Sequence, residues 1–203
     1  MIIIGTNHTG LGRSISIARA GVWRTPLGDA PIATEIAEQL VDRGFPVAEE
    51  AFLREHSVEV QLPFIQYLFG PEIPFVPICV MLPSLGDLIA AGEAIADVAQ
   101  GGPILIVASS DFTHYEPDGI ARRLDMEAIG LILELDVAGF YNLVLAKRLS
   151  ICGAGAIAML LAAAGKLGWN RTDLVSYATS GDVTGDRSAV VGYAALTIER
   201  SDR

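Results

Sequence analysis

All three histidines of this chain lie near the ends of expected segments, among polar and small residues. His8 follows the β-branched run at residues 2–4, and His114 follows the apolar run at residues 103–108. Both runs predict buried strands. Ligands in open α/β folds collect at the carboxyl ends of strands, so we expect both histidines to face one cleft. Each histidine taken alone could instead satisfy a local hydrogen bond.

Two acidic residues accompany these histidines. Asp111 precedes His114 by three residues. A nearby carboxylate fixes the tautomer of an imidazole and raises its basicity, so the pair predicts acid–base catalysis or metal binding. The alternative is that Asp111 caps the following turn. Glu55 adjoins His56, but no second histidine stands at helical spacing, so this is not an HExxH zinc motif.

Cys152 is the cysteine with the better chemical setting. It precedes Gly153 and an expected helix over residues 156–164, and a helix N-terminus favours a thiolate that can act as ligand or nucleophile. A buried, inert thiol is the alternative, and it describes Cys79 better, because Cys79 lies inside an apolar run. Neither cysteine belongs to a CxxC pair, so neither a disulfide framework nor a zinc knuckle is expected.

Expected strands alternate with expected helices. This predicts an α/β fold, one domain over residues 1–203 with a central, mostly parallel or mixed sheet flanked by helices. The run 103–108 is the strongest signal for a buried strand in the chain, and the polar, Gly-rich stretch 180–186 predicts a loop. The other strands are expected at 2–4, 75–80, 174–178 and 189–198, and the helices at 33–42, 85–99, 124–135 and 156–164.

Composition excludes several classes of partner. The net charge is -10 without any basic run, which argues against nucleic acid and against anionic membrane surfaces. Mean hydropathy is high, at +0.44, yet the longest apolar stretches, such as 154–164, are too short to cross a bilayer. The first residues do not have the pattern of a signal peptide, so we expect a cytoplasmic protein.

Seven segments together resemble the Memo-like family, whose archaeal and bacterial members are also called AmmeMemoRadiSam system protein B. Each segment alone is weakly specific, but jointly they are highly specific and extend from the first residues to the last strand. They are residues 5–8 (GTNH), 24–28 (RTPLG), 55–64 (EHSVEVQLPF), 109–114 (SSDFTH), 151–153 (ICG), 177–182 (YATSGD) and 190–193 (VVGY).

The resemblance implies a fold related to class III extradiol dioxygenases and a site for iron or copper. On this pattern His8 and Cys152 are metal ligands, and His114 is the acid–base group with Asp111 beside it. His56 lines the same cleft, where we expect it to contact substrate. We expect the same of Asp182, in the segment 177–182.

Members of the family begin with a further stretch that ends in a strand and a Pro-His-Ala-Gly-Tyr-like loop, which supplies the first metal-binding histidine. Here the chain starts at Met1, directly before the run 2–4. We therefore expect an N-terminally shortened domain whose metal site lacks one ligand. We also expect the first strand to lack a neighbour and so to favour pairing with a second copy of the chain in a homo-oligomer.

The sequence thus predicts a metal-dependent, redox or dioxygenase-like enzyme whose substrate it does not specify. A non-catalytic scaffold that retains the cleft and binds a small molecule or peptide there is the alternative. A third reading is a thiol enzyme that uses Cys152 with a nearby histidine.

Overall fold

A computed structural model describes residues 1–201. Its larger sheet has the strand order β2-β5-β1-β6. β1 (Ile2–Thr6) lies in the middle and pairs in parallel with β5 (Val76–Val80) and with β6 (Ile106–Ala108), while β2 (Ile15–Ile17) is antiparallel to β5. All five residues of β1 are buried, as its β-branched sequence predicts.

Side chains of β1 alternate between two apolar layers, as the two-residue period of a strand requires. Ile2 and Ile4 pack in a cluster with α1 (Thr34–Val41), α3 (Leu85–Ala99) and α6 (Ala154–Leu167). Ile3 packs on the opposite face. That face is covered by the 3-10 helix η1 (Glu49–Phe52), by α2 (Leu62–Phe69) and by the hairpin of β3 (Val22–Thr25) and β4 (Gly28–Pro31). A second 3-10 helix, η2 (Glu59–Gln61), directly precedes α2.

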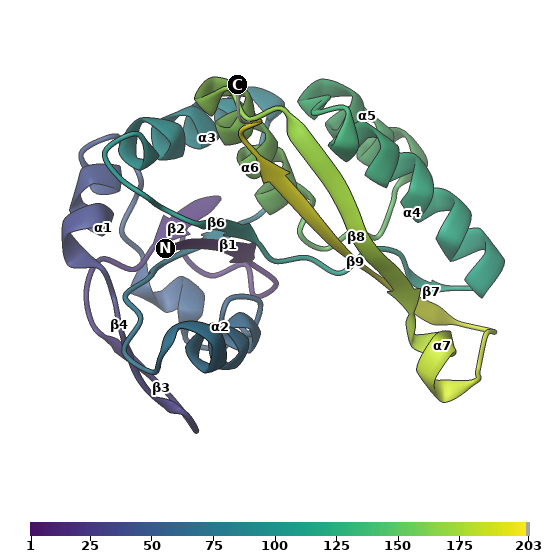
Figure 1. Ribbon diagram of the computed structural model, residues 1–203, viewed down its shortest axis with the longest axis horizontal. Coiled ribbons are helices and arrows are strands. Elements are labelled where there is room, and N and C mark those ends of the chain that lie inside the picture. The colour runs from purple at the N-terminus through teal and green to yellow at the C-terminus, as the bar shows by residue number, and fades with distance from the viewer. Residues whose placement is uncertain (202–203) are drawn as a thin grey trace.

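A second, antiparallel sheet has the order β7-β9-β8. Its strands are β7 (His114–Glu116), β8 (Arg171–Thr179) and β9 (Val190–Glu199), and α4 (Asp118–Leu133) and α5 (Val137–Lys147) pack with it in a separate apolar cluster. In Figure 1 the long β8–β9 hairpin crosses the right half of the molecule and ends at α7 (Ser180–Thr184). Because α6 contributes residues to both clusters, it joins the two halves.

The α/β class, with a mixed sheet flanked by helices, is confirmed, and the helix predicted over 85–99 is α3. Three expectations are wrong. β6 is a short strand at the sheet edge, and Leu105 before it is 50% exposed, because β1 occupies the centre instead. β1 does not lack a neighbour, since it pairs on both sides. Part of the stretch 180–186 forms α7, which a capping box between Thr179 and Asp182 begins.

Within residues 1–201, no helix combines the length and the apolar character that a membrane crossing demands.

Candidate functional site

One pocket of about 320 Å³ gathers five of the six predicted site residues. They come from the loop after β1, the segment before η2, the loop after β6, the start of β7 and the residue pair before α6. Both strand-end loops therefore open on the same side of the sheet, and the prediction of a shared cleft is confirmed. The five residues are His8, His56, Asp111, His114 and Cys152.

Thr6, the last residue of β1, holds two walls of the pocket together. Its carbonyl accepts a hydrogen bond of 2.7 Å from the Ser57 hydroxyl, and its own hydroxyl donates one of 2.8 Å to the Cys152 carbonyl. The neighbouring Gly5 permits this approach, because a Cβ there would lie 2.4 Å from the Ser57 Oγ. The segment that carries His56 is thus fixed against the end of the central strand.

Gly153 has the same function on the other wall. A Cβ at this position would lie 2.5 Å from the Ser109 carbonyl oxygen and 2.4 Å from the Ser110 Cβ. Its amide donates to the Ser110 hydroxyl at 2.8 Å. Because Gly153 has no side chain, the start of α6 packs closely against the loop after β6, and Cys152 is held next to that loop.

Glu55 is the central buried group of the site, and its side chain is 1% exposed. Its Oε1 accepts from the His8 ring at 2.9 Å and from the His56 and Ser57 amides at 2.8 and 3.0 Å, and its Oε2 accepts from the His8 amide at 2.5 Å. Burial alone would raise the pKa of this carboxyl. The hydrogen bonds from the His8 ring and the three amides outweigh burial and lower the pKa to about 2.

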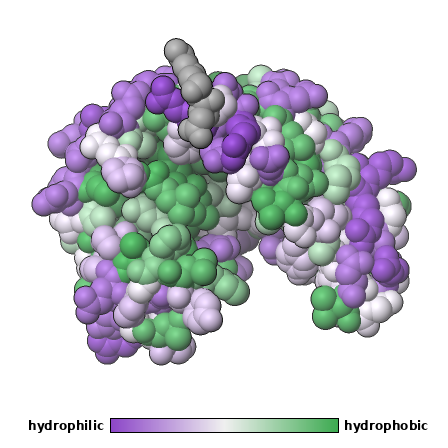
Figure 2. Space-filling view, viewed as in Figure 1, coloured by the Kyte–Doolittle hydropathy of each residue, from purple (hydrophilic) through white to green (hydrophobic). Residues whose placement is uncertain are grey.

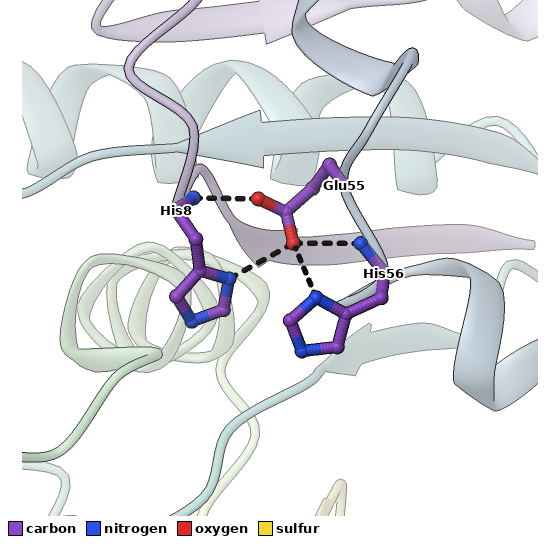
Figure 3. A group of neighbouring side chains, drawn as sticks. All are labelled: His8, Glu55 and His56. Carbon is purple, nitrogen blue, oxygen red and sulfur yellow. Dashed lines mark hydrogen bonds and ion pairs between the residues drawn. The ribbon is translucent and has the colours of Figure 1, made fainter.

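The ionised Glu55 determines how His8 presents its ring. A carboxylate can only accept, so Nδ1 of His8 donates to it and Nε2 keeps a free lone pair. The rings of His8 and His56 stack, with centroids 4.9 Å apart and planes 16° apart. Figure 3 shows both rings on the same side of the carboxylate, with their Nε2 atoms pointing away from it.

These three residues form a compact group of potential metal ligands. Single ligand atoms of His8, Glu55 and His56 all lie within 4.8 Å of one another. Glu55 already accepts from four donors, which suits it to orienting the imidazoles rather than to binding a metal. The side chains of His8 and His56 are 38% and 67% exposed, so their Nε2 atoms are accessible.

His114 stands on the other side of the pocket and is held by Ser150. Its Nδ1 donates to the Ser150 carbonyl at 2.7 Å, and its amide donates to the Ser150 hydroxyl at 2.8 Å. Nε2 of His114 lies 3.9 Å from the Asp111 carboxylate, beyond a hydrogen bond. The carbonyl, and not the carboxylate that the spacing suggested, therefore sets the tautomer of His114.

The two cysteines differ as their sequence contexts predict. Cys152 is half-buried in the pocket wall, and its Sγ accepts a hydrogen bond of 3.1 Å from the Asp111 amide. Cys79 is fully buried, and burial, followed by the charge of Glu55, raises its pKa to about 12. Only Cys152 is therefore placed to react with a molecule in the pocket.

Asp182, predicted to contact substrate, does not line this pocket. Its carboxylate accepts from the Thr179 amide at 2.9 Å, which caps α7, and it pairs with Arg122 at 2.7 Å and Arg187 at 3.1 Å. The Thr179 amide and then Arg122 lower its pKa. These contacts anchor α7 to α4 and give Asp182 a structural position.

Sequence reasoning did not assign a role to Glu55 or Ser150. The position of Glu55 next to His56 indicated that it could belong to a site. Its burial and its hydrogen bond to His8, which lies 47 residues earlier, depend on the tertiary fold. Ser150 contacts the His114 ring through its backbone carbonyl, so its side-chain type did not indicate this role.

Comparison with known proteins decides the family. The model of the Memo-like protein family matches residues 1–197. The chain belongs to the Memo-like family. A MEMO1 family protein of Methanosarcina acetivorans is 44% identical over 200 residues, covering 98% of this chain and 74% of the relative. One from Desulfurococcus amylolyticus is 46% identical, with coverages of 97% and 70%.

A solved structure supports the fold of this Memo-like chain. The crystal structure of an uncharacterized protein from Escherichia coli superimposes with a TM-score of 0.63 at 15% identity, covering 94% of this chain and 84% of the other. At this identity the likeness concerns the fold alone.

Proposed function

We propose that this Memo-like chain is a metal-dependent enzyme whose pocket binds iron or copper through Nε2 of His8. The observation that carries the proposal is the hydrogen bond from His8 Nδ1 to the buried Glu55 carboxylate. Imidazoles that bind metals usually donate their other N–H to a carboxylate or carbonyl, which fixes the ring and raises its basicity. The free Nε2 then faces the pocket.

The other donors around the pocket fit such an ion. His56 offers a second Nε2 next to that of His8. Cys152 offers a thiol in the same pocket, although it lies outside the compact group around Glu55. Imidazole and thiolate donors together suit iron and copper better than magnesium or calcium. His56 is thus a candidate for the position that the family pattern gives to the first metal-binding histidine.

A bound ion of this kind would supply Lewis-acid or one-electron redox chemistry. Proton transfer and substrate orientation would depend on residues of the chain. His114, with Nδ1 committed to Ser150, presents a basic Nε2 that can take a proton from a substrate in the pocket. The Asp111 carboxylate near it would stabilise the resulting imidazolium. The amide of Gln61 and the hydroxyl of Ser110 line the same pocket and can orient a polar substrate.

Anaerobic titration with Fe(II), and separately with Cu(I), tests this proposal by calorimetry. We expect stoichiometric binding by the wild type and a loss of affinity of at least tenfold in His8→Ala. Glu55→Gln keeps both imidazoles but weakens the support of the His8 ring, and it should weaken metal binding by about 10–100-fold. Glu127→Gln is the matched control, because that carboxylate is exposed and pairs with Lys147, away from the pocket. Equal affinities in wild type and His8→Ala would reject the proposal.

A non-catalytic protein that binds a small molecule or peptide is the second candidate, and the apolar groove beside the pocket favours it. Metal binding without any turnover or redox cycling across a panel of catechols, thiols and peptides would favour this candidate. We also propose a cytoplasmic location, because the two free cysteines suit a reducing compartment.

A further inference from the structure

Asp125 is a fully buried acidic residue that the proposed chemistry does not use. It lies on α4, and its Oδ1 accepts a hydrogen bond of 3.0 Å from the Thr113 amide. Its Oδ2 accepts one of 2.6 Å from the hydroxyl of Tyr177 on β8. Gly192 of β9 leaves room for the carboxylate, because a Cβ there would lie 2.0 Å from Oδ2. Three elements thus meet at a carboxylate that binds the residue preceding His114.

The two donors to this carboxylate are uncharged, an amide and a phenol, and no cation pairs with it among residues 1–201. Arg122 lies over the Tyr177 ring, with its Cζ 5.6 Å from the centroid, but its guanidinium pairs with Asp118 and Asp182. Burying a carboxylate without a counter-ion is costly. An apolar side chain would fill the same space at lower cost, so the polar group itself points to a role in holding the segment that it binds.

The hydrogen bonds around Thr113 fix the backbone on both sides of its Cα. Its amide donates to Asp125, and its carbonyl accepts from the Gly192 amide at 2.9 Å. The next amide, that of His114, donates to the Ser150 hydroxyl. The Thr113 hydroxyl has no partner among the described residues, so the backbone groups alone provide this anchoring. Both peptide planes that flank Thr113 are thereby held, and with them the direction in which the His114 side chain leaves the backbone.

The backbone directly after His114 is strained. Tyr115 has a φ of 62°, a left-handed conformation that bulky side chains rarely adopt. The pairing of β7 with β9 shifts register at the same point. A bend of this kind persists only where its surroundings fix it. The Tyr115 side chain is exposed, so the anchors lie on the residues before it; the hydrogen bond to Asp125 is buried, whereas that to Ser150 is exposed.

Contacts within one half of the molecule must position His114. Figure 2 shows a hollow between the two halves, with hydrophobic surface on both sides of it. His8 and His56 belong to the half with the larger sheet, and His114 belongs to the half with the antiparallel sheet. Asp125 and Tyr177 belong to the same half as His114, so they can fix it independently of the other two histidines.

We infer that Asp125, held by Tyr177, is the positioning residue of His114. It fixes the strained bend at residues 113–115 and so directs Nε2 of His114 into the pocket, with Nδ1 in reach of the Ser150 carbonyl. Asp125 does not contact substrate, because it is fully buried and does not line the pocket. The inference rests on the proposed function only for the use of His114 as a base.

Nitrogen-15 NMR of the metal-free protein at pH 8 tests this inference, because the three histidines report separately. In the wild type we expect a single His114 tautomer, with the proton on the Nδ1 that donates to Ser150. Asp125→Ala should release the bend, so that His114 populates both tautomers while the signals of His8 stay unchanged. Hydrogen exchange at the Thr113 amide should accelerate at least about tenfold relative to the amides of β1, which report global unfolding.

Asp125→Asn is the conservative variant, since its side-chain oxygen can still accept from the Thr113 amide. It should keep the single His114 tautomer and nearly wild-type exchange at Thr113. Tyr177→Phe leaves the carboxylate less constrained, so exchange at Thr113 should accelerate by a smaller factor, about threefold. Glu127→Gln is the matched control and should change neither readout, because its carboxylate is exposed on the same helix.

A purely structural role of Asp125 would lower the melting temperature of Asp125→Ala and leave the His114 tautomer as it is. That result would overturn the inference, as would equal effects of Asp125→Asn and Asp125→Ala. If Asp125→Ala does not fold, Tyr177→Phe decides, and unchanged relative exchange at Thr113 would then overturn the inference. All of these readouts are taken without metal, so they do not depend on whether the pocket binds iron or copper.

Discussion

Replacing Glu55 by glutamine should destabilise the protein in a pH-dependent way. The pKa of this carboxyl falls from its ordinary 4.5 to about 2 in the folded chain, and the side chain is 1% exposed, so solvent screens it little. The difference corresponds to roughly 3 kcal/mol of stability at pH 7. Because the folded pKa is the lower one, this stability is complete above about pH 4.5 and is lost as pH falls toward 2.

The glutamine side chain could keep an oxygen in place of Oε1, but its NH₂ group would then replace Oε2 and meet the His8 amide, donor against donor. We therefore expect Glu55→Gln to lower the free energy of unfolding by roughly 3 kcal/mol at pH 7 and by about half that at pH 3, where the wild type has itself lost stability.

Urea denaturation of both proteins, in steps from pH 7 to pH 3, measures this difference. Glu127→Gln is the control, and its exposed pair with Lys147 should be worth less than about 1 kcal/mol at any pH. A deficit of Glu55→Gln that stays constant across the pH range would refute the reasoning, because it would mean that the carboxylate charge contributes nothing.

Three further outcomes can be checked on the same preparation. Gly153→Ala should lower the free energy of unfolding, measured by urea denaturation, by about 1–3 kcal/mol, since the new Cβ meets the Ser109 carbonyl. An unchanged free energy would contradict this, because it would show that the loop after β6 moves to accommodate the Cβ. Cys152 should react with a small thiol reagent in the native protein and Cys79 only after unfolding, because Cys79 is fully buried; two fast thiols would contradict this. Nitrogen-15 NMR at pH 8 should find His8 protonated on Nδ1, and a signal from the other tautomer would contradict the bond to Glu55.

The sequence was sufficient to locate the pocket but not its central group. His8 and His114 could be placed together because strand ends meet at one edge of a parallel sheet. Burial of Glu55 could not be anticipated, since two of its four hydrogen bonds come from His8, which lies 47 residues earlier in the chain. The contacts of Asp182 were equally hidden, because its arginine partner Arg122 lies 60 residues earlier in the chain.

The misjudged strand follows the same logic. The run 103–108 is longer than the β-branched run of β1, yet only 106–108 pair, at the edge of the sheet. The hydrophobicity of a segment predicts that it is buried, but it does not predict which segments pack around it. Strand order is set by contacts between segments far apart in the chain, and it was accessible only from the structure.

The position of α6 has a mechanical consequence. Ten of its fourteen residues are buried, and it packs into the apolar clusters of both halves. The two halves thus share this helix in their cores. No strand among residues 1–201 pairs with both β6 and β9, which belong to different sheets. His8 and His56 belong to one half and His114 to the other, so a small rotation about α6 would change the spacing of the imidazoles. A ligand that held the two halves in one relative orientation would therefore also fix the distance between these imidazoles.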